Sequence, residues 1–245
     1  MDFTIEELTI NAWPSLQTIL LGGWIIRMAD GYTKRSNSVI PLYSFESNID
    51  EKINYCKTIY KNCNLPIIYK IIECEEHKLI DKRLEELKYD KIDVTSVQVY
   101  DGINQTNFLK ENIIIDNIFS ENWKKCFFYC NSITDSKVIA TIESMLKNVR
   151  YDIISVFKME NENLVACGYG VIERGFIGLF DIIVKEEFRG KGYGREIVET
   201  ILAKAKGAGI KKAYLSVVNN NAIAKNMYEK IGFKEIYKYW YRKKN

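Results

Sequence analysis

The chain has 245 residues, of which 47% are hydrophobic and 27% charged, with 14 glycines and only 3 prolines. This mixture is typical of a soluble globular protein with one large or two small domains, and it excludes collagen-like and largely disordered chains. The longest apolar run near the start, residues 19–26, is far shorter than the ~20 residues of a membrane helix. Residues 1–7 are acidic, unlike a signal peptide. We therefore expect a cytoplasmic protein without a membrane partner.

The formal charge of +3 is unevenly distributed along the chain. Residues 189–245 hold 14 Lys and Arg against 4 Asp and Glu, a net charge of +10, so residues 1–188 carry −7. A basic C-terminal region suggests an anionic partner such as a nucleotide cofactor, a nucleic acid or a membrane surface. On charge alone, a solvated lysine-rich surface is the favoured interpretation.

Composition also limits the reactive side chains. His77 is the only histidine, so multi-histidine metal sites are excluded and a Ser-His-Asp triad would have to use this residue. The six cysteines form no C-x-x-C pair, although Cys126 and Cys130 lie four residues apart in an apolar stretch. Scattered buried thiols are the favoured interpretation, with a disulfide framework or a zinc site as alternatives. We therefore predict no metal site.

The first hundred residues are predicted to alternate between strands and helices. Apolar spacing, with Asp50 as the N-cap, predicts a helix over 50–62. The other predicted elements are helices over 5–12 and 76–87, an extended segment over 17–29 that is broken at Gly22-Gly23, and strands over 38–43, 66–72 and 95–100. The polar stretch 101–107 is the best candidate for a domain boundary.

The rest of the chain is predicted to contain consecutive strands followed by α/β units. The predicted helices cover 120–131, 134–148, 192–206 and 221–231, and the predicted strands cover 153–159, 164–173, 176–184, 212–218 and 233–242. Hairpin-like connections followed by α/β units indicate an α/β protein of the α+β type. We expect a mixed, mostly antiparallel sheet with helices on both faces.

A glycine-rich turn between a buried strand and a helix is the most informative motif. The strand over 176–184 is followed by Arg189-Gly190-Lys191-Gly192-Tyr193-Gly194, which opens a helix. Glycines permit positive φ and a close approach to the main chain, and the free N–H groups of a first helical turn bind phosphates. The turn is neither a P-loop nor a dinucleotide-binding fingerprint, which would need glycine in place of Arg195. Alone, it is equally typical of an ordinary strand-to-helix connection.

Two motifs together make this turn specific. Arg189-x-x-Gly192-x-Gly194 resembles the R/Q-x-x-G-x-G/A acetyl-CoA motif of the GNAT superfamily of N-acetyltransferases. Downstream, the chain resembles the family's N-x-x-A-x-x-L-Y-x-x-x-G-F signature, with Asn221-x-x-Ala224-x-x-Met227-Tyr228-x-x-x-Gly232-Phe233. The resemblance covers residues 153–242. It implies acetyl-CoA as the co-substrate and a GNAT-like sheet.

In this family the acyl-CoA lies in an opening between the fourth and fifth strands, which here correspond to 176–184 and 212–218. The resemblance implies that the pantetheine arm is bound by Ile182, Ile183, Val184 and Asn221. It implies that the pyrophosphate is bound by the main chain of Arg189, Gly190, Lys191, Gly192, Tyr193 and Gly194. The side chains of Lys191 and Arg195 would screen the phosphate charges.

The resemblance also implies catalytic roles. Tyr228 would lie near the sulfur and protonate the leaving thiolate, although a tyrosine here is also typical of core packing beside Phe233. Asp181 on the fourth strand and Glu173 on the preceding one are the candidate general bases, with water as a third. In a regular strand Asp181 faces away from its neighbours, and a bulge would change that. Because an acyl-Cys167 route needs an activated thiolate, direct attack in a ternary complex is favoured.

The first half resembles a degenerate copy of the second. Its predicted order of elements repeats, and residues 84–89 can be laid on 228–233, with Leu84 in place of Tyr228. Residues 44–48 stand near the position of the glycine turn but contain no glycine. We therefore expect two GNAT-like domains: residues 1–104 without a CoA motif and a catalytic domain over 105–245. The polar run 32–38 resembles a stretch of tandem-type bacterial GNAT proteins and suggests an acceptor-binding or interdomain surface, or a solvated hairpin.

The expected function is acetyl-CoA-dependent N-acetylation of an amine acceptor whose identity the sequence does not indicate. A CoA-binding regulatory pseudoenzyme is the first alternative, and the intact Tyr228 argues against it. A less favoured second alternative is a nucleic-acid-binding protein that uses the basic C-terminal region, where residues 237–244 alternate aromatic and basic side chains that could stack on bases. Such alternation is more typical of sheet packing. The acidic first half hints at a cationic acceptor.

Overall fold

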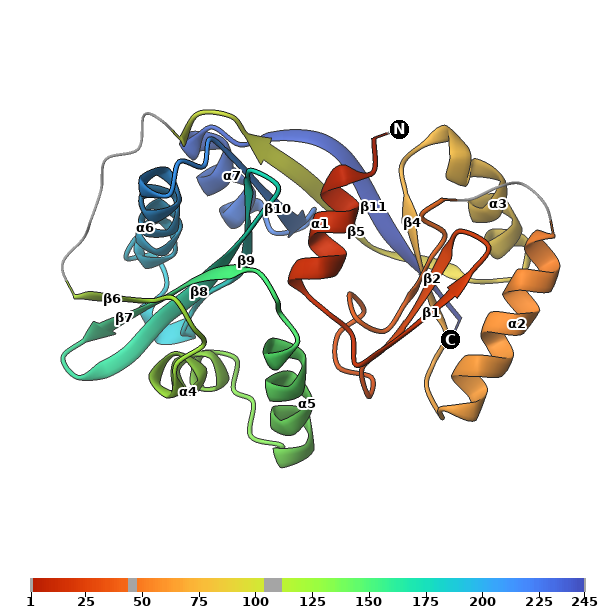
Figure 1. The fold of residues 1–245 in the computed structure, drawn as a ribbon, viewed down its shortest axis with the longest axis horizontal. Helices are drawn as coiled ribbons and strands as arrows, with labels where there is room; N and C mark the ends of the chain where they lie inside the picture. The colour runs from red at the N-terminus through yellow and green to blue at the C-terminus, as the bar shows by residue number, and fades with distance from the viewer. Residues whose placement is uncertain (1, 44–47, 104–111, 245) are drawn as a thin grey trace.

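The computed structural model describes residues 2–43, 48–103 and 112–244. Helices lie on both faces of one long sheet (Figure 1). The helices are α1 (Thr4–Ala12), α2 (Ile49–Asn62), α3 (Lys78–Glu86), α4 (Glu121–Cys130), α5 (Ser136–Lys147), α6 (Tyr193–Gly207) and α7 (Ala222–Ile231), with 3-10 turns η1 (Glu75–His77) and η3 (Glu186–Phe188). The strands are β1 (Gln17–Leu21), β2 (Trp24–Met28), β3 (Val39–Ile40), β4 (Ile68–Ile72), β5 (Asp90–Tyr100), β6 (Ile113–Asp116), β7 (Asp152–Glu160), β8 (Asn163–Glu173), β9 (Phe176–Val184), β10 (Lys212–Val218) and β11 (Lys234–Lys243).

The sheet order shows that the two halves of the chain are interleaved. It runs β1-β2-β3-β4-β11-β5-β10-β9-β8-β7-β6. The last strand, β11, therefore lies between β4 and β5 of the N-terminal half (residues 2–103), where Tyr239 pairs with both Ile72 and Thr95. In turn, β5 pairs with β10 of the C-terminal half (residues 112–244). The two halves therefore share one sheet, in which β11 borders β4 and β5 of the N-terminal half and β5 borders β10 of the C-terminal half (Figure 1).

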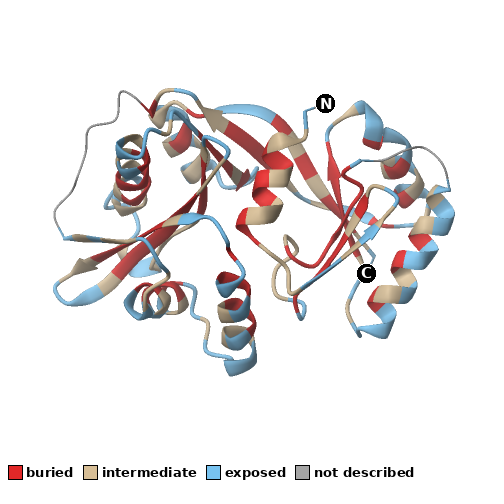
Figure 2. Cartoon of the chain, in the orientation of Figure 1, coloured by how far each residue is buried: buried red, intermediate tan, exposed pale blue. Residues whose placement is uncertain are grey.

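The core also crosses between the halves. One apolar cluster joins Leu8 and Ile72 of the N-terminal half to Trp123 and Tyr169 of the C-terminal half. A second cluster lies under α6, which packs on β7, β8 and β9, while α4 packs on the same three strands. Figure 2 shows the buried residues concentrated along the central strands and on the inward sides of the helices. Burial of this continuous apolar surface is the main force that holds the halves together.

The predicted elements agree with the structure, with small differences. Asp50 is not the N-cap of α2: Asn48 is, with φ of 62°, and Asp50 lies in the first turn, where it binds Arg83. Its carboxylate still suits the positive end of the helix dipole. The strand predicted over 38–43 is only the two residues of β3, and β6 was not predicted because four residues carry too little pattern. Most of the predicted boundary 101–107 lies outside the described residues.

In the described ranges, no helix combines the length and the apolar character needed to cross a membrane.

Candidate functional site

The two parallel strands of the C-terminal half separate partway along their length. β9 and β10 pair from Phe176↔Lys212 to Leu179↔Leu215. Beyond that point β10 continues beside β5, and β9 continues beside β8 up to Val184. The β10-facing side of the main chain from Ile182 to Val184 is therefore free of strand partners among the described residues. It can pair with an extended ligand that lies in the opening.

A β-bulge lies at the point of separation. Asp181 has φ of 47°, and the register with β8 shifts so that Asp181 and Ile182 together oppose Gly168. A Cβ at Gly168 would come within 2.5 Å of the Ile182 side chain, so a larger residue here would force that side chain to move. Because of the bulge, Asp181 lines the central cavity described below, as do its neighbours Phe180 and Ile182.

A cavity of about 940 Å³ extends from the opening to the glycine turn, and we call it the glycine-turn cavity. Gly190 and Gly192 have φ of 81° and 86°, and a Cβ at either would meet only open space. The N–H groups of the first turn of α6 border this space and lack intrahelical partners. Of the predicted cofactor residues, the cavity is lined by Ile182, Ile183, Val184, Arg189, Gly190, Gly192, Tyr193, Gly194, Arg195 and Asn221.

The basic side chains near the turn are engaged with acidic neighbours. Lys191 does not line the cavity, and its Nζ lies 3.1 Å from Glu160 Oε2. Arg195 Nε lies 2.7 Å from Glu199 Oε1. These are half-exposed surface pairs, which contribute little stability and can rearrange around a bound anion.

A second cavity of about 510 Å³ lies between the halves, and we call it the central cavity. Its walls come from α1, the 32–38 run, β5 and β11 as well as from β9, β10 and α7. It shares Ile182, Ile183, Asn221, Ala224 and Tyr228 with the glycine-turn cavity. The two spaces therefore meet beside Tyr228.

Tyr228 is positioned both to pack in the core beside Phe233 and to reach the proposed reaction site, the two roles that the sequence left open. Its ring packs edge-on against Phe233 with centroids 5.8 Å apart, and the residue is only 7% exposed. It nevertheless borders both cavities, and its hydroxyl has no hydrogen-bond partner among the described residues. Burial raises the pKa of this phenol, so it stays protonated and able to donate at neutral pH. Beside it, the Asn221 side chain caps α7 by accepting a bond from Ala224 N at 3.1 Å.

Asp181 is held by an arginine from the other half of the chain. Arg35 Nη2 donates to Asp181 Oδ1 at 2.9 Å, and the guanidinium also lies over the Trp13 ring. Burial lowers the pKa of Arg35, but the charge of Asp181 and its hydrogen bond raise this pKa by more than burial lowers it. The net shift of the Arg35 pKa is therefore upward. The second carboxylate oxygen of Asp181, Oδ2, is buried without a described partner. Arg35 and Lys34 line the central cavity, which places the 32–38 run at the junction of the halves.

The remaining candidate bases and nucleophiles lie away from both cavities. Glu173 is at the far end of β8, where its Oε1 accepts bonds from Asn11 at 2.9 Å and pairs with Arg174. Cys167 faces α4, and its pKa is raised by hydrogen bonding to Cys126 and Cys130 and by burial. A protonated, enclosed thiol is a poor nucleophile, which disfavours the acyl-Cys167 route.

The central cavity contains residues to which sequence reasoning gave no role, among them Thr9, Asp93, Thr95 and Ser216. Its other lining residues include Thr33, Lys34 and Arg35 of the polar run 32–38, for which an acceptor-binding or interdomain surface was suggested, and Tyr239 and Tyr241 of the run 237–244. The tyrosines of β11 that could have stacked on nucleic-acid bases, Tyr237, Tyr239 and Tyr241, are buried in the sheet.

Residues 4–242 match the protein family described as the C-terminal part of the probable histone acetyltransferase Rv0428c. The chain belongs to this family. It is a GNAT-type N-acetyltransferase, with a mixed, mostly antiparallel sheet of the tandem GNAT kind. An uncharacterized N-acetyltransferase, YobR of Bacillus subtilis, is 27% identical over 97% of this chain and 96% of its own length.

Solved structures share the fold of this acetyltransferase at low sequence identity. A conserved protein of unknown function from Staphylococcus epidermidis has a TM-score of 0.71 at 16% identity, covering 100% of this chain and 98% of that one. A tandem GNAT protein from the clavulanic acid biosynthesis pathway has a TM-score of 0.68 at 6% identity, covering 97% and 86%. A GCN5-related N-acetyltransferase from Kribbella flavida has a TM-score of 0.67 at 12% identity, covering 94% and 90%.

Proposed function

We propose that this acetyltransferase uses acetyl-CoA and transfers the acetyl group to an amine by direct attack in a ternary complex. The observation that carries the proposal is the meeting of two cavities beside Tyr228, one suited to the cofactor and one to the acceptor. An amine and a thioester that enter from opposite sides would then react without a covalent enzyme intermediate.

The cofactor is assigned to the glycine-turn cavity. Its pyrophosphate would accept bonds from the N–H groups at the start of α6, where the helix dipole favours negative charge. Its pantetheine arm would pair with the free main-chain edge from Ile182 to Val184, as an added strand does. This pose brings the thioester to the point where the cavities meet.

The acceptor is assigned to the central cavity. The Asp181 carboxylate lines this cavity, and its buried Oδ2 has no described hydrogen-bond partner. A turn of the side chain that keeps the bond from Arg35 to Oδ1 would expose Oδ2 to an ammonium group, whose proton it can take directly or through a water molecule. Glu173 lies too far along β8 to compete for this role, so Asp181, with or without water, is the proposed base.

The chemistry then follows from these positions. The neutral amine nitrogen attacks the thioester carbonyl carbon and forms a tetrahedral intermediate, and the C–S bond breaks with its electron pair passing to sulfur. Tyr228 donates a proton to the departing thiolate, and the second amine proton passes through water to restore the Tyr228 phenol. Asp181 releases the first proton to solvent, so the turnover yields one proton in total. General acid catalysis of this kind contributes ~10²–10⁴-fold.

The test is acetyl-CoA turnover by the full-length chain against a panel of amines, with free CoA thiol and acetylated product both measured. Stoichiometric release of both products supports the proposal, and Gly192→Val should abolish it. Tight acetyl-CoA binding without turnover on any amine would instead identify a regulatory pseudoenzyme.

A further inference from the structure

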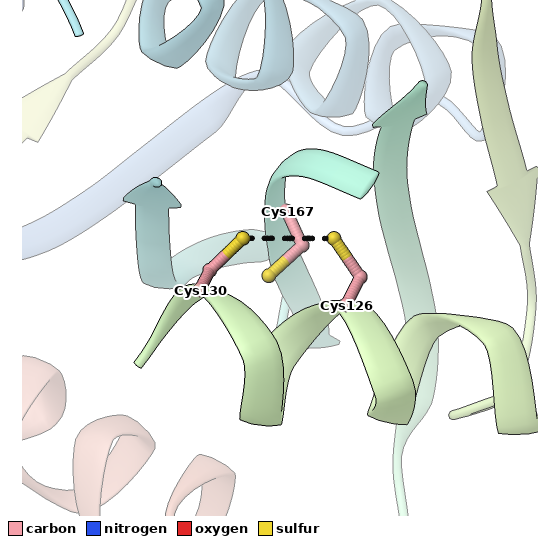
Figure 3. A group of neighbouring side chains, drawn as sticks. All are labelled: Cys126, Cys130 and Cys167. Atoms are coloured by element: carbon pink, nitrogen blue, oxygen red, sulfur yellow. Dashed lines mark hydrogen bonds between the residues drawn. The ribbon is translucent and has the colours of Figure 1, made fainter. Parts of the chain in front are cut away.

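Three cysteines that the acetyl transfer does not use lie together in the C-terminal half. Cys126 and Cys130 are one turn apart on α4, and Cys167 lies on the strand β8 that α4 covers. Figure 3 shows the three side chains converging between helix and strand. All three are buried, and their Sγ atoms lie within 4.8 Å of one another, with Cys126 and Cys130 at 3.8 Å.

The spacing of these sulfurs fits one shared ion. Three sulfurs bound to a metal at ~2.3 Å lie about 3.8–4.0 Å from one another, so only small side-chain movements are needed. Two rigid elements hold the ligands, and the i, i+4 spacing puts both helix thiols on the same face. Within the described ranges, the group consists of cysteines alone, with no histidine or carboxylate. A donor set made only of sulfur selects thiophilic ions over Mg²⁺ or Ca²⁺.

The cluster has a route to solvent. Cys130 is at the C-terminal end of α4 and lines the glycine-turn cavity, whereas Cys126 and Cys167 lie deeper. Lys185 borders the same cavity and anchors this end of α4, because its Nζ donates to Tyr129 O at 3.2 Å. An ion can therefore enter from this cavity past Cys130.

We propose that Cys126, Cys130 and Cys167 bind one thiophilic closed-shell metal ion, Zn²⁺ or Cu⁺, as three thiolates. Binding replaces three S–H bonds with three metal–sulfur bonds and releases three protons to solvent, so it needs no oxidant or reductant. The sequence favoured scattered buried thiols and left a zinc site as an alternative, and the grouping of these three cysteines supports that alternative. Of the three cysteines, Cys130 reaches the glycine-turn cavity, but the proposed acetyl transfer uses none of them, and metal binding does not depend on that function.

The experiment titrates the reduced, full-length protein with Zn²⁺ and, in a separate arm, with Cu⁺, each against a coloured competing chelator. We expect one equivalent of one of these ions and only sulfur neighbours from the protein at ~2.3 Å by X-ray absorption. The arm that reaches one equivalent at the lower free-ion concentration identifies the ion. Cys126→Ala and Cys130→Ala should each weaken binding at least tenfold.

Matched controls come from cysteines outside the cluster. Cys56 is buried in the N-terminal half and Cys63 is exposed, and Cys56→Ala and Cys63→Ala should both retain one equivalent. Circular dichroism checks that each variant folds. Should Cys126→Ala fail to fold, Cys130→Ala at the rim of the cavity carries the test. Failure of both ions to bind the reduced protein, or undiminished binding by folded cluster variants, would overturn the proposal.

Discussion

Among the described residues, each half of the molecule has a pair of parallel strands, and the pair β9–β10 of the C-terminal half separates to open into a cavity. In the C-terminal half, β9 and β10 pair over four residues and then separate around the Asp181 bulge. In the N-terminal half, β3 has two residues and a single recorded pair with β4, Val39↔Tyr69. A short strand provides little free main chain for an extended ligand to pair with.

The helices that follow these strands begin alike but carry different side chains. α2 and α6 both begin after a residue in the left-handed conformation, Asn48 and Gly192. Leu84 on α3 is fully buried and brings no polar atom, whereas Tyr228 on α7 brings a hydroxyl to the meeting point of two cavities. The fold is thus repeated while the chemistry is not. The stretch 44–48 stands near the position that corresponds to the glycine turn, and its residues 44–47 are outside the described residues.

The N-terminal half still contributes to the site. It supplies Arg35 to Asp181, and it supplies β5 and the α1 side of the central cavity. Because β11 completes its sheet, this half is not a detachable unit. The difference between the halves therefore suggests a division of labour, in which one half binds the cofactor and both halves together enclose the acceptor.

The largest expected effect tests where the cofactor binds. Gly192→Val puts a branched side chain at φ of 86°, into the open space where the pyrophosphate is proposed to lie. We expect acetyl-CoA to bind at least 100-fold more weakly, which corresponds to about 2.7 kcal/mol, and its thermal stabilisation of the protein to disappear. Calorimetry and thermal shift measure both.

The matched control for this variant is Gly209→Val. Gly209 lies just beyond the other end of α6, has φ of 80° and is also surrounded by open space. It should therefore carry the same backbone strain but leave acetyl-CoA binding unchanged. An undiminished thermal shift in Gly192→Val would show that the phosphates bind elsewhere.

The next effect separates catalysis from packing at Tyr228. Tyr228→Phe removes only the hydroxyl, so the ring should still pack on Phe233. We expect kcat to fall at least tenfold, within the ~10²–10⁴-fold range of general acid catalysis. The acetyl-CoA dissociation constant should change less than threefold, as for an interaction made mainly in the transition state.

Phe233→Leu is the packing control for this variant: it should lower the thermal stability of the protein while leaving kcat nearly intact. An unchanged kcat in Tyr228→Phe, with chemistry rate-limiting, would assign the tyrosine to the core alone.

Much of the fold and of the cofactor site could be predicted because the signals are local. The Gly192–Gly194 turn and the Asn221–Tyr228 segment each lie within one strand-to-helix unit, where spacing along the chain fixes spacing in space. The central cavity could not be predicted in this way. Arg35 and Asp181 are 146 residues apart, and their contact depends on the exchange of β5 and β11 between the halves. The sequence raised a bulge at Asp181 only as a possibility, because strand alternation alone assigns that side chain to the other face.

A smaller effect tests whether the N-terminal half forms part of the wall of the central cavity, where the acceptor is proposed to bind. Arg35→Met removes the charge and the hydrogen bond that hold Asp181 Oδ1, while keeping an extended side chain over Trp13. A hydrogen bond to a charged group contributes about 1.5 kcal/mol at the lower end, so KM for the amine should rise roughly tenfold. The acetyl-CoA dissociation constant should stay the same. Arg83→Met, which breaks a surface ion pair with Asp50 in the same half, should change neither constant. A loss of acetyl-CoA affinity in Arg35→Met would contradict the division of labour.

The smallest expected effect is an absence of change with pH. Burial disfavours the phenolate of Tyr228 and raises its pKa above the ordinary tyrosine value of about 10, so the proton that it donates is retained as pH rises. The acid must be protonated to act, so kcat should stay level from pH 8 to about pH 10 instead of falling as it would for a solvent-exposed tyrosine. Steady-state rates at saturating amine and acetyl-CoA, measured where circular dichroism shows the protein folded, give this profile.

The expectation fails if kcat of the wild type declines with a midpoint below pH 10 and this decline is missing in Tyr228→Phe. The Tyr228 phenol would then ionise more easily than its buried environment allows. A decline shared by both proteins belongs to another group and leaves Tyr228 as the acid.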